Sequence, residues 1–93
     1  MKRQQTLNAA RKAVGSRHRR YGTPTANFEA IARLWGAHLT TKLGTPVEIT
    51  PTDVALMFVY TKGARLQHDQ AHADSWIDIA GYAACGAEAA EAK

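Results

Sequence analysis

The sequence predicts an all-α fold, a bundle of about four helices. Apolar residues recur at helical spacings in four separate segments, and turn or helix-start residues lie between these segments. A chain of 93 residues is also long enough for one domain only. We therefore expect one domain overall, made of a basic N-terminal helical arm at residues 1–20 and a helical bundle at residues 21–93.

The first helix is expected at residues 6–20. Thr6 can cap its start, and apolar residues at spacings of three and four form its packed face: Leu7, Ala10 and Val14. The run Tyr21-Gly22-Thr23-Pro24 is a turn signal that ends this helix.

The second helix is expected to begin at Thr23 or Thr25 and to end at Leu43. One apolar stripe follows the i, i+3, i+4, i+7, i+11 pattern: Phe28, Ile31, Ala32, Trp35 and Leu39. Gly44 supplies a C-terminal stop, and Pro46 prevents continuation of the helix.

The third helix is expected at residues 51–66. Thr50-Pro51-Thr52-Asp53 combines an N-cap residue, a proline at the first position and an acid at the third. The run from Val54 to Tyr60 is apolar throughout, so periodicity alone does not separate helix from buried strand; the Thr-Pro start and the length out to Arg65 favour helix. Because apolar residues surround this helix, we expect a partner chain to cover one side of it.

A polar loop at residues 67–73 is expected to lead into a fourth helix at residues 73–88. This last helix carries small residues that allow close approach of another helix. Its lone cysteine, Cys85, excludes an intrachain disulfide and is expected to be a buried small residue rather than a nucleophile.

The basic charge is concentrated at the N-terminus. Residues 1–20 carry seven basic residues and no acid, whereas residues 21–93 carry five basic and eight acidic residues. Such an arm suits nucleic acid, a phosphate-bearing ligand or an acidic protein surface; the alternative is a solvated helix that aids solubility. No apolar run approaches the ~18 residues of a membrane span, and no secretory signal is present, so we expect a cytoplasmic protein without membrane contact.

Four charged residues form the main candidate for chemistry. Asp74 and Asp78 lie one turn apart on the fourth helix, and Lys62 and Arg65 share a side of the third. An antiparallel return would bring the two pairs face to face. Either they form salt bridges, for example a bidentate Arg65–Asp78 pair, or Asp74 and Asp78 bind Mg²⁺ while Lys62 and Arg65 neutralise the phosphates of a ligand.

Other chemical motifs are weaker. His68 and His72 are four apart, a spacing that can bind a transition metal on a helix, but they lie in the expected loop without a third ligand. The chain has no Gly-rich phosphate loop and no zinc-finger spacing.

The segments Tyr21-Gly22, Ile49-Thr50-Pro51-Thr52-Asp53-Val54-Ala55, Lys62-Gly63-Ala64-Arg65 and Asp74-Ser75-Trp76-Ile77-Asp78-Ile79-Ala80-Gly81-Tyr82-Ala83, with Phe28 and Trp35, form a pattern. It resembles small phage- and prophage-encoded proteins of unassigned function. Through them it is similar to the MazG-like all-α NTP pyrophosphohydrolases, which hold Mg²⁺ against a nucleoside triphosphate and assemble as dimers or tetramers.

The resemblance implies a homo-oligomer, a dimer or tetramer, that binds a nucleotide or phosphate ligand with Asp78 at the metal position and Tyr82 nearby, and that hydrolyses NTP or dNTP to NMP and pyrophosphate. Lys62 and Arg65 would contact the phosphates of this ligand. One departure stands out: basic residues occupy the third helix where the MazG-like enzymes carry Glu-x-x-Glu. The alternative is a non-enzymatic phage accessory protein whose arm, residues 2–20, binds nucleic acid or a host protein.

Overall fold

The computed structural model describes residues 1–91, with only the backbone of Tyr21 included. Over this range the chain forms four α-helices and no strand: α1 (Arg3–Tyr21), α2 (Pro24–Leu43), α3 (Pro51–His68) and α4 (Ala73–Glu91). The predicted all-α fold is therefore confirmed. None of these helices is both long and apolar enough to cross a membrane.

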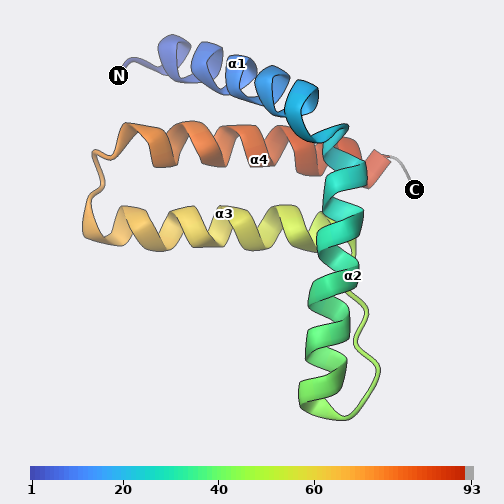
Figure 1. The fold of residues 1–93 in the computed structure, drawn as a ribbon. Coiled ribbons are helices and arrows are strands. Elements are labelled where there is room, and N and C mark those ends of the chain that lie inside the picture. The colour runs from blue at the N-terminus through green and yellow to red at the C-terminus, as the bar shows by residue number, and fades with distance from the viewer. Residues whose placement is uncertain (92–93) are drawn as a thin grey trace.

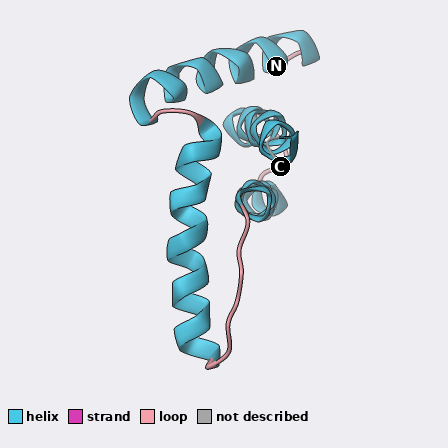
Figure 2. Ribbon diagram, turned by 90° about the vertical axis from the view of Figure 1, so that its right-hand side faces the viewer, coloured by secondary structure: helices cyan, strands magenta, loops and turns pink. Residues whose placement is uncertain are grey.

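Helix α4 lies in the middle of the molecule. It forms an antiparallel hairpin with α3 on one side, and α1 runs along its other side in the same direction as α4 (Figure 1). Helix α2 stands across these three, and its C-terminal half extends beyond them together with the link to α3 (Figure 2). Residues from α1, α2 and α4 consequently meet where α2 begins.

The starts of α2 and α3 are fixed by the predicted caps. The Thr23 hydroxyl accepts a hydrogen bond from the Ala26 N–H at 3.1 Å. At α3, the Thr50 hydroxyl accepts from the Asp53 N–H at 3.1 Å, while the Asp53 carboxylate accepts from the Thr50 N–H at 3.0 Å. Both orphan donors at this helix start are thus satisfied reciprocally.

The predicted cap at Thr6 is wrong, because α1 begins three residues earlier, at Arg3. The Gln5 side chain accepts a hydrogen bond from the Lys2 N–H at 2.9 Å and satisfies a donor at the helix start. Thr6 lies inside the helix and donates its hydroxyl proton to the Lys2 carbonyl. The helix ends also differ elsewhere by a few residues, as at α4, which extends to Glu91.

The core lies where α2 crosses the α3–α4 hairpin. Phe28, Ala32, Val54 and Ala55 are buried there, and the Phe58 ring contacts three other aromatic rings, those of Phe28, Trp35 and Tyr82. Small residues set the helix spacing: a Cβ on Gly86 would lie 3.0 Å from the Ala55 Cβ, and one on Gly81 would lie 3.5 Å from a Val14 methyl. The apolar stripe predicted for α2 thus faces this core from Phe28 to Trp35.

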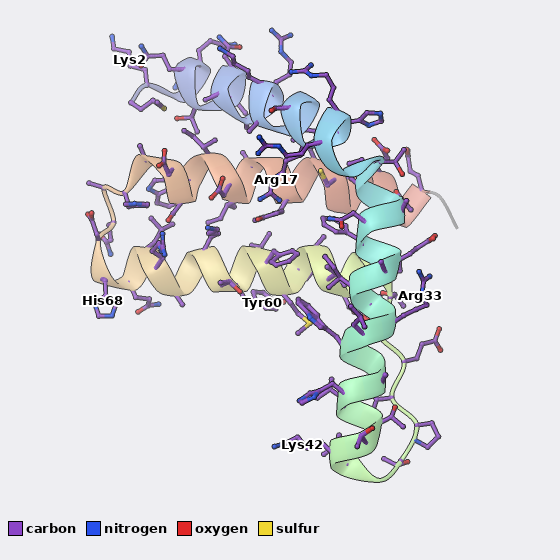
Figure 3. All side chains as sticks on the ribbon, in the orientation of Figure 1. Lys2, Arg17, Arg33, Lys42, Tyr60 and His68 are labelled. Atoms are coloured by element: carbon purple, nitrogen blue, oxygen red, sulfur yellow. The ribbon has the colours of Figure 1, made fainter. Side chains whose placement is uncertain are left out.

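The outer face of α3 carries exposed apolar side chains. Tyr60 is 66% exposed, and Leu56 and Met57 are also exposed on the side turned away from α4. Figure 3 shows Tyr60 on this side of α3. Within one chain, α3 is therefore covered by α4 and α2 but not on this outer face.

Candidate functional site

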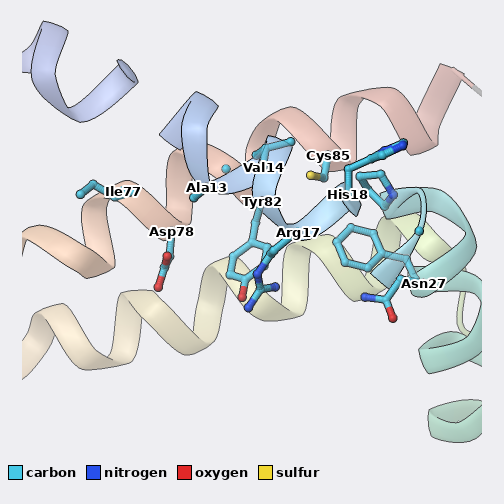
Figure 4. A pocket seen from close by; sticks show the side chains of 13 residues that line it. Ala13, Val14, Arg17, His18, Asn27, Ile77, Asp78, Tyr82 and Cys85 are labelled. Atoms are coloured by element: carbon cyan, nitrogen blue, oxygen red, sulfur yellow. The ribbon is translucent and has the colours of Figure 1, made fainter. Parts of the chain in front are cut away.

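A groove open to solvent lies between α1, the start of α2 and α4 (Figure 4). Its walls are mostly apolar. Side chains from three helices line it, among them Val14 and Arg17 from α1, Asn27 and Phe28 from α2, and Ile77, Asp78, Tyr82 and Cys85 from α4. We call this site the α1–α4 groove.

The side chains of Arg17 and Tyr82 lie side by side in the groove (Figure 4). The Arg17 guanidinium carbon is 5.7 Å from the centre of the Tyr82 ring, within cation–π distance. The Tyr82 ring also stacks on Phe58, with centroids 5.0 Å apart and planes inclined by 20°. Tyr82 is therefore held by the core on one side, and the exposed Arg17 side chain lies within cation–π distance of its ring.

Asp78 borders the groove and forms an ion pair with Lys62 across the hairpin. The Lys62 Nζ is 3.1 Å from the Asp78 carboxylate, and the two side chains are 22% and 38% exposed. Arg65, three residues further along α3, turns about 60° away around the helix. In the part of the chain that the structure describes, the cation paired with Asp78 is thus Lys62 rather than Arg65.

Asp74 and Arg65 are both exposed, and neither forms an ion pair within residues 1–91. The structure therefore brings together Lys62, Asp78 and Tyr82 of the predicted site residues. Asp74 lies one turn before Asp78, at the end of the hairpin where the loop joins α3 to α4.

These residues fit a resident Mg²⁺ poorly. No group of three or more His, Cys, Asp or Glu side chains is placed to hold a metal ion among the described residues. The Asp78 carboxylate is also already neutralised by Lys62. Magnesium binding by Asp74 and Asp78 stays a prediction, and no chemical step is derived through the metal.

The two histidines of the predicted loop have separate roles. His68 is exposed as the last residue of α3. The His72 Nδ1 lies 2.8 Å from the Ser75 hydroxyl and 3.3 Å from the Ser75 amide nitrogen, whose N–H it accepts. His72 therefore caps the start of α4, and Ser75 is buried beneath it.

Cys85 lines the groove and is half-buried. Burial raises the pKa of its thiol, the Glu88 carboxylate raises it further, and the Arg17 guanidinium opposes the shift. A thiol with a raised pKa stays protonated at neutral pH and is a poor nucleophile. Cys85 is best explained as a small residue of the groove wall.

Arg17 and Asn27 were missed by the sequence-based selection of site residues. A signal for Arg17 exists: it follows Ala10 and Val14 at helical spacing, which places it on the packed face of α1. Residues 1–20 contain six other basic residues, and a count of charges does not show which of the seven faces α4. For Asn27, no sequence signal separates it from the rest of α2.

Comparison with known proteins identifies relatives of this chain. A family model described as a domain of unknown function, DUF6378, matches residues 5–90. The chain is 48% identical over 69 residues to the Gene 55 protein of Mycobacterium phage L5, an alignment covering 74% of this chain and 41% of that protein. It is 39% identical over 77 residues to the Gene 55 protein of Mycobacterium phage D29, covering 83% and 47%.

The chain thus spans less than half the length of these two relatives. No solved structure matches it. The prediction of a family with phage-encoded members is confirmed, whereas the similarity to MazG-like enzymes stays a prediction. Because the family model covers nearly the whole chain, this protein belongs to the DUF6378 family.

Proposed function

We propose that the α1–α4 groove binds a small organic phosphate of the nucleotide type. The observation that carries this proposal is the position of Arg17. Its guanidinium is held over Tyr82 at the wall of an otherwise apolar groove, and no ion pair or hydrogen bond uses it within residues 1–91. A guanidinium presents five N–H donors in a fixed fork that matches a phosphate.

The charge of the groove favours an anion. Asp78 is the acid that borders it, and Lys62 neutralises this carboxylate at 3.1 Å. Arg17 therefore contributes a positive charge that no ion pair neutralises within residues 1–91, beside apolar walls that strengthen its attraction for a phosphate.

The rest of the groove suits the organic part of such a ligand. Val14, Ile77 and Phe28 give apolar walls, and the Asn27 side chain supplies an amide donor and acceptor at the α2 side. An apolar pocket with a few polar groups is the usual form of a small-molecule site. A nucleotide combines these features: phosphates for Arg17, a flat apolar base for the walls and polar base edges for Asn27.

Hydrolysis of NTP or dNTP to NMP and pyrophosphate, as the similarity to MazG-like enzymes implies, would extend this function. Such hydrolysis would require a metal ion to activate water, and the described residues fit a resident Mg²⁺ poorly. We therefore propose nucleotide binding as the function, whether or not hydrolysis follows. It would take place in the cytoplasm, where nucleotides are available.

The test is calorimetric titration of the protein with a panel of NTPs and dNTPs, with and without Mg²⁺, together with an assay for released pyrophosphate. We expect binding of at least one nucleotide, weakened about tenfold or more in Arg17→Gln, which corresponds to about 1.4 kcal/mol. Arg11→Gln is the matched control, because Arg11 is an exposed cation of α1 outside the groove. Absence of binding across the panel, or equal losses in both variants, would refute the proposal.

We also propose that a second copy of the chain covers the exposed face of α3. Leu56, Met57 and Tyr60 are apolar or aromatic and lie together on that face, exposed by 45%, 38% and 66%. Tyrosine and methionine are enriched in protein interfaces. Light scattering after size exclusion should give a dimer or tetramer that Tyr60→Glu dissociates, with unchanged helicity; a monomeric parent protein would contradict this part of the proposal.

A further inference from the structure

The cations of α1 divide into two groups when the helix is packed. Ala10 is 5% exposed, and Val14 packs on Gly81, so this side of α1 faces α4. Arg17 shares that side and points into the groove. Between about a quarter and half a turn away, the helix presents exposed side chains that we call its outer face: Gln4, Asn8, Arg11, Lys12 and Arg19.

We infer that this outer face of α1 is a binding surface for duplex DNA, separate from the α1–α4 groove. All five of its side chains are exposed, and the chain has no acid before Glu29 to compensate them. Figure 3 shows nitrogen-tipped side chains projecting from α1 away from α4. Lysine and arginine contact phosphates, and amides such as Gln4 and Asn8 hydrogen-bond to phosphates or base edges.

Helix geometry supports a duplex as the partner. Arg11 and Arg19 are eight residues apart and lie about 12 Å apart along the axis, so the cations extend along the helix instead of forming one point charge. The major groove of B-DNA is about 12 Å wide and admits an α-helix. Helix α1 lies at the edge of the molecule, where α4 covers only its inner side (Figure 1).

Other polyanions fit this face less well. Single-stranded nucleic acid is usually bound by aromatic side chains between the cations, and the outer face has none. The major groove of duplex RNA is too narrow for side chains to read. A membrane-surface helix needs a broad free apolar face beside the basic one, whereas in α1 Ala10 and Val14 are packed on α4 and Leu7 is left exposed.

The test measures the affinity of the full chain for a fluorescently labelled 20-base-pair duplex by anisotropy, between 25 and 200 mM salt. We expect binding that weakens steeply with salt, because each neutralised phosphate releases counterions. The test variant replaces three outer-face cations together: Arg11→Gln, Lys12→Gln and Arg19→Gln. Its log–log salt slope should fall by about 3 relative to the parent protein, and its affinity at low salt by tenfold or more.

A second triple variant makes the same change in net charge on α2 and α3, where the exposed cations lie outside α1: Arg33→Gln, Lys42→Gln and Arg65→Gln. This control should keep the parent slope and most of the affinity, and circular dichroism should show the same helicity for all three proteins. Equal losses in both variants would mean that net charge alone governs binding. That result, no salt-dependent binding by the parent protein, or tighter binding to single strands or anionic vesicles than to the duplex would overturn the inference.

Discussion

The α3–α4 hairpin and helix α1 differ in whether their charged side chains form contacts within the chain. In the hairpin, Asp78 is paired with Lys62, and Asp53 is hydrogen-bonded at the start of α3. In α1, the cations have no acid on their own helix, and Arg17 is the one held against another side chain in the part of the chain described. Three charged residues of the hairpin thus form polar contacts that hold the fold, whereas the cations of α1 form no ion pair in the part of the chain described.

This difference separates charged residues that stabilise the fold, in the hairpin, from charged residues of α1 that are available to bind another molecule. Like charges one turn apart on a helix repel each other slightly, so the composition of α1 brings no benefit to the isolated chain. The packing that holds α1 comes instead from small apolar residues such as Ala10 and Val14. Substitutions in the hairpin should therefore change stability, and substitutions on the outside of α1 should change binding.

The largest effect is expected at the closest contact of the hairpin. Gly86→Val should lower the free energy of unfolding by about 2 kcal/mol, because even a Cβ at this position would lie 3.0 Å from the Ala55 Cβ. The control is Gly63→Ala in α3, where a Cβ meets nothing within 4 Å; it should raise stability by about 0.5–1 kcal/mol. Urea unfolding followed by circular dichroism measures both, and an unchanged Gly86→Val would show that the helix spacing adjusts freely.

The next effect concerns the cap of α3. Thr50→Val removes a hydroxyl that accepts from the Asp53 N–H and should cost about 1 kcal/mol. The same substitution at Thr52 should be neutral or stabilising, because the Thr52 hydroxyl oxygen is buried without a hydrogen-bond partner among the described residues. Thermal unfolding of the two variants side by side gives the comparison, and equal losses would contradict the role of the cap.

These examples also show which features could be predicted from the sequence. The starts of α2 and α3 depend on side chains within three residues of the cap, so Thr23 and Thr50 could be identified directly. At α1 the same local reasoning selected Thr6, because the backward hydrogen bond of Gln5 is a weaker signal. Element types were thus predictable, and element ends less so.

The candidate site depends on contacts between helices and could be predicted only in part. An antiparallel hairpin was enough to place Asp78 opposite Lys62 or Arg65, but choosing between these cations required the rotation of α3 about its axis. The inward position of Arg17 depends on the close approach of α1 to Gly81, which no local pattern specifies.

A smaller effect is expected for the ion pair itself. Lys62→Met and Asp78→Asn should each cost less than about 1 kcal/mol, because the Asp78 side chain is 38% exposed and solvent screens the pair. A double-mutant cycle at low and high salt would measure the coupling, which should shrink as salt increases. A loss of several kcal/mol in either single variant would instead indicate a pair that is buried in solution, for example within an oligomer.

The smallest effect is expected on the pKa of the Cys85 thiol, which lies where α1 meets the hairpin. Burial and Glu88 raise the pKa of the Cys85 thiol, and Arg17 lowers it. Because the folded-state pKa is above the unfolded-state pKa, the thiol contributes stability that is present below the unfolded-state pKa and lost as pH rises through the folded-state pKa. Alkylation by iodoacetamide should therefore begin at higher pH in the folded protein than in the urea-unfolded chain.

Arg17→Gln should move this alkylation midpoint to still higher pH, since the cation that favours the thiolate is gone. Arg20→Gln removes an equal charge from an exposed position of α1 that does not line the groove, and should leave the midpoint where it was. If both variants shifted it equally, Arg17 would act only through the overall charge of α1. A shift confined to Arg17→Gln would show that this one cation of α1 acts inside the groove while the others face outward.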